Sequence, residues 1–270
     1  MNRYADLPTV WHERPVAATS LGQLGEGFAT FWHGAGYLRR HTPLWKWAVL
    51  PTLVNIVLTI LVLWGYLHYA AEITSTLPDY SSTEWKSLAA LGYIGNVILV
   101  VLVYLLLLLV AAMVWKLFSA LFCGYLFGVL AMRVEESLGT PAAELRGASF
   151  IYETLGALLS FLVLLVLNIA LIAVAFIPIV GTIVAIVLGT VLTCWVMGVD
   201  YFGLAWALRG APRWTQYARA TRHNAHAIGL GAIVFLCEFV PIIGGVGLTL
   251  AVIGGVLLQR KIRLSAAPRA

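Results

Sequence analysis

The feature that most constrains this chain is its series of long apolar segments. The first covers residues 44–70 and the second residues 88–132. A helix needs about 20 apolar residues to cross the roughly 30 Å hydrocarbon core of a bilayer, so both segments are long enough. Their apolar residues do not alternate with polar ones as they would in an outer-membrane barrel. The chain is therefore predicted to be an all-α integral membrane protein.

Composition agrees with this prediction. Only 11% of the residues are charged and 61% are hydrophobic, whereas about a quarter of a soluble domain is charged. The formal charge is +5, but the basic residues lie in short segments between apolar blocks, which indicates membrane topology and not nucleic-acid binding. The three cysteines lie in apolar stretches, and no metal site is predicted for them.

The second apolar segment is too long for a single crossing. We expect residues 91–115 to cross the bilayer, and residues 117–132 to continue as an interfacial or protein-packed helix. With the first segment this predicts two long transmembrane helices.

Two helical hairpins are predicted to follow. Residues 149–177 and 179–199 form the first pair, and residues 228–239 and 242–258 form the second. The first arm of the second pair has only about 12 apolar residues, which is short of a span. We therefore expect this last hairpin to penetrate the bilayer only partly, with protein or a water-filled cavity covering its turn.

The tips of the two hairpins are near copies, Phe-Ile-Pro-Ile-Val-Gly at residues 176–181 and Phe-Val-Pro-Ile-Ile-Gly at residues 239–244. Broken helices of this kind can direct partial charges at an ion. The alternative is a favourable turn sequence in apolar surroundings. The tip residues in question are Pro178, Gly181, Pro241 and Gly244.

The predicted organisation is a cytoplasmic tail at residues 1–26, one polytopic helical membrane domain at residues 27–263 and a disordered tail at residues 264–270. Most basic residues lie before the first span, in the loop 133–147, in the segment 200–227 and at the C-terminus. By the positive-inside rule both termini are predicted to be cytoplasmic.

Several short motifs follow one another along the chain: Gly34 to Asn55, especially Leu50 to Asn55, then Val134-Glu135-Glu136 with Gly139, Ile177-Pro178 with Gly181, Asp200-Tyr201, Arg219 to Arg222, Gly231 and Val240-Pro241. In this order they resemble the CysZ-type sulfate permeases and the wider etoposide-induced-protein membrane family, from about residue 27 to 263. The resemblance implies a multimer with two long crossing helices and partly inserted hairpins. The expected location is the plasma membrane, which would be the inner membrane if the source is a Gram-negative bacterium. It also implies passage of sulfate for cysteine biosynthesis.

The chain departs from those permeases just before the first long helix. A Gly-Leu-Arg-Arg type stretch is associated with sulfate there, whereas this chain has Pro43-Leu44-Trp45-Lys46. Lys46 keeps one cation, and Arg39 and Arg40 lie about one helical turn earlier. These three are the predicted anion-binding residues, the alternative being cations that flank a span under the positive-inside rule.

Three further residues are candidates for a role in transport. Arg219 and Arg222 share a face if their stretch is helical, and could form an anion vestibule or a basic surface that faces lipid headgroups. Glu238 is the acid deepest in an apolar run, and could gate the path or carry a coupling proton, or pair with a buried basic group or hydroxyl.

The sequence is compatible with two functions. The first is a permease or channel for a small oxyanion, with sulfate as the leading substrate, without ATP hydrolysis and without a cofactor. The second is a membrane organiser or accessory subunit that transports nothing. No enzyme motif is present, since the sequence has no Walker loop, zinc-protease signature or Gly-x-Ser-x-Gly element. The expected partners are membrane lipid, sulfate and further copies of the chain, with no nucleic acid.

Overall fold

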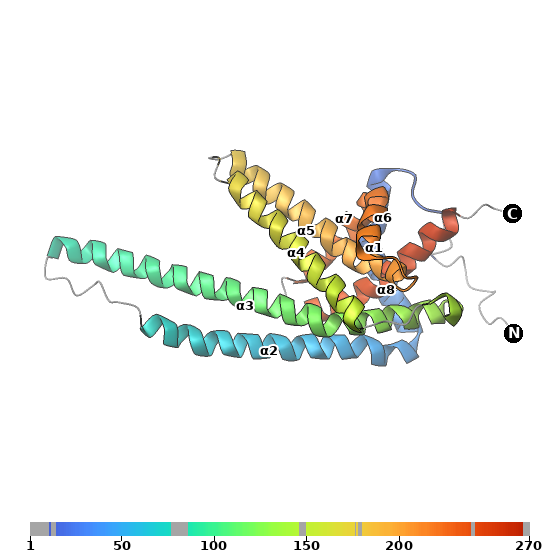
Figure 1. The fold of residues 1–270 in the computed structure, drawn as a ribbon, viewed down its shortest axis with the longest axis horizontal. Helices are drawn as coiled ribbons and strands as arrows, with labels where there is room; N and C mark the ends of the chain where they lie inside the picture. The colour runs from blue at the N-terminus through green and yellow to red at the C-terminus, as the bar shows by residue number, and fades with distance from the viewer. Residues whose placement is uncertain are drawn as a thin grey trace. The chain divides into compact units, whose positions relative to one another are not determined.

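A computed structural model describes residues 11, 15–76, 86–145, 150–175, 177, 180–238 and 241–266. The regular elements in this part of the chain are all helices, which confirms the all-α prediction (Figure 1). Length and composition qualify five of its segments as candidate membrane spans, which supports an integral membrane protein. They are Thr42–Ser75, Ile94–Ser137, Leu158–Ala175, Val180–Ala207 and Gly244–Ala266.

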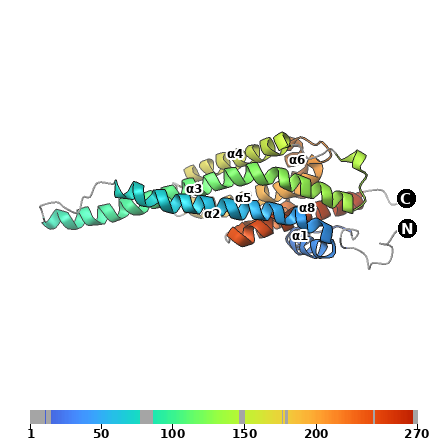
Figure 2. The same cartoon turned by 90° about the horizontal axis from the view of Figure 1, so that it is seen from below.

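The two long helices are α2 (Trp45–Ser75) and α3 (Lys86–Ser137). They run side by side in both views (Figures 1 and 2). At about 1.5 Å per residue, the 52 residues of α3 measure about 78 Å, more than twice the hydrocarbon thickness of a bilayer. The second apolar segment therefore does continue as helix well beyond a single crossing.

The two predicted hairpins are present. The first pairs α4 (Phe150–Ala175) with α5 (Val180–Ala207), and the second joins α7 (Asn224–Glu238) to α8 (Pro241–Ala266). The 15 residues of α7 measure about 22 Å, which is shorter than the hydrocarbon core. The partial insertion of this hairpin stays a prediction, because α8 alone is a candidate span.

Two helices were not predicted. The first, α1 (Ser20–Arg40), begins inside the segment assigned to the N-terminal tail. Its buried face follows helical spacing through Gly27, Phe31, Gly34 and Leu38, but glycines interrupt the apolar pattern. The second, α6 (Arg213–Ala220), lies within the basic segment and leads through the short helix η5 (Thr221–His223) into α7. At the other end, α8 continues to Ala266, past the predicted start of the C-terminal tail.

The chain divides into two compact units, one made of residues 1–54 and 120–270 and the other of residues 55–119. In the larger unit α1 packs on α7 and α8, and α5 packs on α7 and α8. Glycines make the closest approaches: a Cβ on Gly231 would stand 1.6 Å from the Cys194 carbonyl oxygen, and one on Gly198 1.8 Å from that of Ala227. The crossing of α5 and α7 therefore depends on residues without side chains.

The smaller unit consists of the facing parts of α2 and α3. Trp115 Nε1 donates to Thr59 Oγ1 at 3.0 Å, and Ser119 Oγ donates to Asn55 Oδ1 at 3.3 Å. Hydrogen bonds of this kind join helices in a medium where apolar contact alone gives little driving force.

Candidate functional site

The predicted anion-binding residues lie where α1 ends and α2 begins. Arg39 and Arg40 occupy the last turn of α1, and Lys46 lies in the first turn of α2, with the short helix η2 (Thr42–Leu44) between them. All three side chains are exposed. Within the described part of the chain, none of them forms a salt bridge or a side-chain hydrogen bond.

A fourth cation joins these three. The guanidinium of Arg133, on α3, lies 5.3 Å from the centre of the Trp47 ring, and Lys46 Nζ lies 5.7 Å from the same ring. The hydroxyls of Tyr37 and Ser137 are 2.8 Å apart and fasten the end of α1 to the end of α3. We call Arg39, Arg40, Lys46 and Arg133 the corner cluster. Sequence reasoning missed Arg133, although its place directly after an apolar segment marked it as an end-of-span cation.

The corner cluster carries more positive than negative charge. Glu136 pairs with Arg133 at 2.8 Å, which leaves the other three cations exposed to a ligand. Arg39 and Arg40 also lie at a helix C-terminus, where cations are favourable without any ligand. The cluster can therefore attract an oxyanion from solution, and part of its charge also stabilises α1.

The two vestibule candidates lie on other elements. Arg219 is in α6 and Arg222 is in η5, and both side chains are exposed. These elements contact α5 and α7. No contact that the structure describes joins Arg219 or Arg222 to the corner cluster.

The hairpin tips differ in how strongly they require glycine. A Cβ on Gly181 would lie 2.1 Å from the Val174 carbonyl oxygen, so the first tip cannot accept a side chain there. A Cβ on Gly244 would meet its nearest atom at 3.3 Å. Pro178 lies outside the described residues, and Pro241 begins α8. Glu238 is the last residue of α7 and is half-buried.

Sequence reasoning did not find the buried ion pairs. Glu135 is fully buried, its Oε1 lies 2.9 Å from Arg209 Nη2, and it accepts from Thr140 Oγ1 at 2.6 Å. Arg263 approaches the same carboxylate at 4.0 Å. This arrangement joins the ends of α3, α5 and α8.

A second buried pair joins α1 to α8. Lys261 Nζ donates to Glu26 Oε1 at 2.7 Å, and lies 4.5 Å from the centre of the Trp11 ring. The other oxygen of Glu26 lies 3.2 Å from His226 Nε2 and accepts from the Ala17 amide at 3.2 Å. Lys261 is only 2% exposed, so its charge depends on this carboxylate.

The pKa values of Glu26 and His226 are both lowered, for different reasons. Burial alone would raise the pKa of Glu26, but the hydrogen bonds from Lys261, the Ala17 amide and His226 outweigh it, and the pKa is lowered. Burial lowers the pKa of His226 below its ordinary value, although Glu26 opposes this shift. At neutral pH the structure therefore favours a charged Glu26 beside a neutral His226.

A third network fixes the start of α6. The guanidinium of Arg213 pairs with Asp200 and donates to the Ser160 hydroxyl, and its Nη1 donates to Gln216 Oε1 at 3.0 Å. Tyr217 donates to the same Ser160 hydroxyl at 2.9 Å. Arg213 is thus committed to internal contacts, unlike Arg219 and Arg222.

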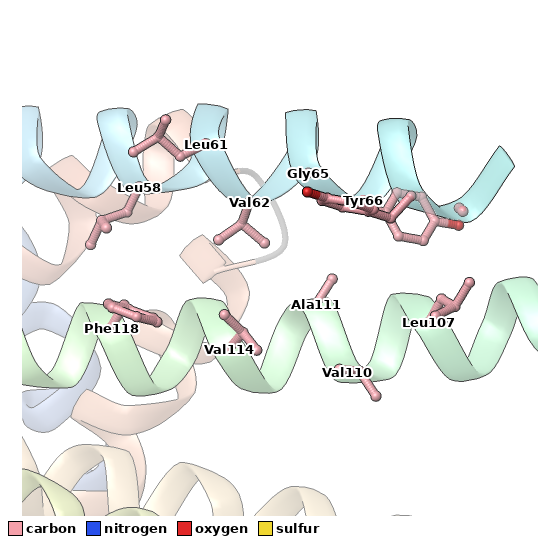
Figure 3. A pocket seen from close by; sticks show the side chains of 12 residues that line it. Leu58, Leu61, Val62, Gly65, Tyr66, Leu107, Val110, Ala111, Val114 and Phe118 are labelled. Atoms are coloured by element: carbon pink, nitrogen blue, oxygen red, sulfur yellow. The ribbon is translucent and has the colours of Figure 1, made fainter. Parts of the chain in front are cut away.

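One groove lies within the smaller unit. It has a volume of about 430 Å³ and lies between α2 and α3 (Figure 3). Leu58, Val62, Ala111 and Val114 line it, and Gly65 widens it. Its lining has no cation, so this groove does not offer an oxyanion site. Among the residues searched, no group of three or more His, Cys, Asp or Glu side chains could hold a metal ion.

A comparison with protein families matches most of the chain to a known family. A family model described as "Sulfate transporter CysZ/Etoposide-induced protein 2.4" matches residues 30–247. The matched region includes the corner cluster, both hairpin tips and Arg219 with Arg222. It leaves out Glu26 and Lys261.

Proposed function

Because the chain belongs to the sulfate transporter CysZ/etoposide-induced protein 2.4 family, we propose that it is a membrane permease or channel for a small oxyanion, with sulfate as the leading substrate. The family includes sulfate transporters. In this proposal the protein works in the plasma membrane as a homo-oligomer. Flux follows the electrochemical gradient or a coupled ion, without ATP hydrolysis.

The corner cluster is the observation that carries the proposal. Sulfate is a dianion, and arginine presents a planar set of N–H donors that matches an oxyanion. Arg39, Arg40 and Lys46 are exposed and lie within one short stretch that joins α1 to the first long helix. We assign the recruitment of the anion to these three residues, with Arg133 as the neighbouring cation. In the same proposal Glu238, at the turn of the second hairpin, gates the path or carries a coupling proton.

The test is uptake of labelled sulfate into liposomes that contain the purified protein, compared with empty liposomes. The native protein should give saturable uptake. The triple variant Arg39→Ala/Arg40→Ala/Lys46→Ala should lose at least about tenfold, since one charge-assisted hydrogen bond of about 1.5 kcal/mol already corresponds to a factor of ten. The charge-conserving variant Arg39→Lys/Arg40→Lys/Lys46→Arg is the matched control and should keep most of the uptake.

Two results would contradict the proposal in different ways. If the triple alanine variant takes up sulfate at the native rate, the corner cluster is not the anion contact, even though sulfate passes. If correctly inserted native protein takes up no sulfate with the pH gradient in either direction, sulfate is not the substrate. Another solute or the non-transporting organiser role would then remain.

A further inference from the structure

The segment α6–η5 has two distinct faces. Its inner face is held by the buried contacts of Arg213 and Gln216, and by Ala220, which is fully buried. Its outer face exposes Trp214, Arg219 and Arg222. Trp214 is 71% exposed, although tryptophan is among the largest apolar side chains. We call Trp214, Arg219 and Arg222 the outer face of α6–η5.

The charge of this segment is not balanced by nearby acids. Residues 201–237 contain no Asp or Glu but four arginines. Two of them have acidic partners from other parts of the chain, since Arg209 pairs with Glu135 and Arg213 with Asp200. Arg219 and Arg222 have no salt bridge with any residue that the structure describes. A negatively charged ligand is therefore electrostatically favourable at the outer face.

The depth of the segment can be placed from its contacts. Arg213 binds Asp200 and Ser160, which belong to the candidate spans Val180–Ala207 and Leu158–Ala175. Ser160 lies in the half of α4 that is farther from the hairpin tip, and Asp200 lies in the half of α5 that is farther from the tip, so both lie toward the same end of the α4–α5 hairpin. Because α6 starts against these residues, a bilayer-spanning α4–α5 hairpin would hold it where the two helices leave the hydrocarbon core. That is the level of the lipid headgroups.

We propose that the outer face of α6–η5 binds anionic phospholipids. Arg219 and Arg222 contact the phosphate groups, and the Trp214 ring lies at the boundary between headgroups and acyl chains. Tryptophan is enriched at this boundary, and arginine binds phosphate through a fork of N–H donors. Basic residues next to a span attract the anionic lipids of the cytoplasmic leaflet.

The same arginines could also attract a free oxyanion such as sulfate. The large exposed Trp214 ring on the same short helix as Arg219 favours the lipid, because a small inorganic anion gains nothing from an apolar side chain, whereas a lipid presents both phosphate and hydrocarbon to the segment. Both arginine side chains are exposed among the residues that the structure describes, so a small ion bound there would keep much of its water. This assignment does not depend on sulfate transport.

The test is native mass spectrometry of the full chain in detergent, with equal amounts of phosphatidylglycerol and phosphatidylcholine. The native protein should retain phosphatidylglycerol preferentially. Arg219→Ala/Arg222→Ala should lower this preference roughly 25-fold, about fivefold for each arginine near the membrane surface. Arg219→Lys/Arg222→Lys should keep most of it, because the charge remains.

Two further measurements complete the test. In nanodiscs containing brominated phosphatidylglycerol, the quenching of tryptophan fluorescence should fall in Trp214→Phe, because the exposed ring contacts the lipid. Sodium sulfate and sodium chloride at equal ionic strength should displace phosphatidylglycerol equally, because they act by screening alone.

Three outcomes would overturn the assignment. The first is no lipid preference in the native protein, and the second is an unchanged preference in a folded double alanine variant. The third is stronger displacement by sulfate than by chloride, which would identify the outer face as a site for free oxyanions.

Discussion

The two hairpins have near-identical tips but different surroundings. In the most apolar stretch of α8, 78% of the residues are buried inside the protein. The corresponding shares in α4 and α5 are 12% and 28%. The second hairpin is covered by α1 and crossed by α5, whereas the first leaves most of its described apolar residues unburied within the single chain. The shared Pro-Ile-x-Gly sequence therefore does not determine how far each hairpin is covered, which depends on the helices that pack against its arms.

The difference in cover comes from residues far from the tips. Gly27 of α1 lies against the backbone of α7 at His226, and Gly34 lies against that of α8 at Leu250. Such contacts bring the helix axes close and exclude both lipid and water. The arms of α4 and α5 instead carry branched apolar side chains such as Ile169 and Ile186, which are exposed.

The largest expected effect comes from loosening α1 from the second hairpin. Glu26→Gln should lower the free energy of unfolding by about 3–5 kcal/mol, because it leaves the buried Lys261 without its carboxylate. Chemical unfolding of the purified protein in mixed micelles, followed by tryptophan fluorescence, measures the loss. The double variant Glu26→Gln/Lys261→Met should regain part of the stability, because it removes the unpaired charge. A loss below about 1 kcal/mol in the single variant would show that the pair does not hold the cover in place.

A somewhat smaller effect is expected at the crossing of α5 and α7. Gly231→Ala should cost about 3 kcal/mol, because the new methyl group would clash with the Cys194 carbonyl and force the helices apart. Gly156→Ala in α4 is the matched control, since its Cβ would meet only Arg213 Cδ at 3.9 Å. The control should be neutral or stabilising by up to about 1 kcal/mol through helix propensity. Equal unfolding midpoints for the two variants would contradict the contrast between the hairpins.

A substitution at the base of the first hairpin should lower the free energy of unfolding less than one at the contact between α1 and α8. Asp200→Asn should cost about 1–2 kcal/mol, because Asp200 is partly exposed and Arg213 keeps its bonds to Ser160 and Gln216. The same unfolding assay measures it beside Glu26→Gln. A loss equal to that of Glu26→Gln would mean that the two hairpins are fastened equally.

The smallest expected effect is a dependence on pH. In the folded protein the pKa of His226 is lowered from its ordinary value of 6.5. Below about pH 6.5 the unfolded chain therefore binds more protons than the folded protein, and stability should fall as the pH drops. Glu26, Lys261 and His223 are the charged or titratable groups around this ring. The lowered pKa of Glu26 acts in the same direction at more acidic pH, because its contribution is lost as pH falls through the folded value.

Hydrogen exchange can locate this pH effect. Protection in α7 should decline between pH 7 and pH 5.5 relative to α4, since residues 150–207 contain no histidine. His226→Gln should flatten the decline in α7. A decline of the same size in α4 would show that His226 does not control it.

Long apolar runs were enough to predict α2, α3 and the two hairpins, including the short arm α7. They did not reveal α1, because its buried face is built from glycine, threonine and aromatic residues spaced around a helix and not from a continuous apolar run. They also missed α6, whose eight residues are mainly polar. The average hydrophobicity of a stretch of sequence does not show these two helices, because tertiary packing stabilises them.

Of the corner cluster, the sequence predicted the cations Arg39, Arg40 and Lys46 but not the residues that surround them. Arg213 and Arg219 lie in the same basic segment, yet one is bound to Asp200 and the other is exposed. Arg133 joined the corner cluster because α3 ends beside α1, which a linear sequence does not show. Pairs such as Glu135 with Arg209 depend on tertiary packing, so their partners could not be identified from spacing along the chain.

The contact between Glu26 and Lys261 also has a consequence for synthesis of the chain, because its two residues are made at very different times. The two residues are 235 positions apart, so α1 leaves the ribosome on the order of 10–50 s before the lysine that completes its contacts, at about 5–20 residues per second. During that interval the glycine-lined face of α1 has no α8 to pack against. A nascent chain that stops before Lys261 keeps an unmatched carboxylate and an uncovered helix, both of which the cell's quality-control proteases can recognise. The helix that carries Lys261 thus secures α1, which is synthesised long before it.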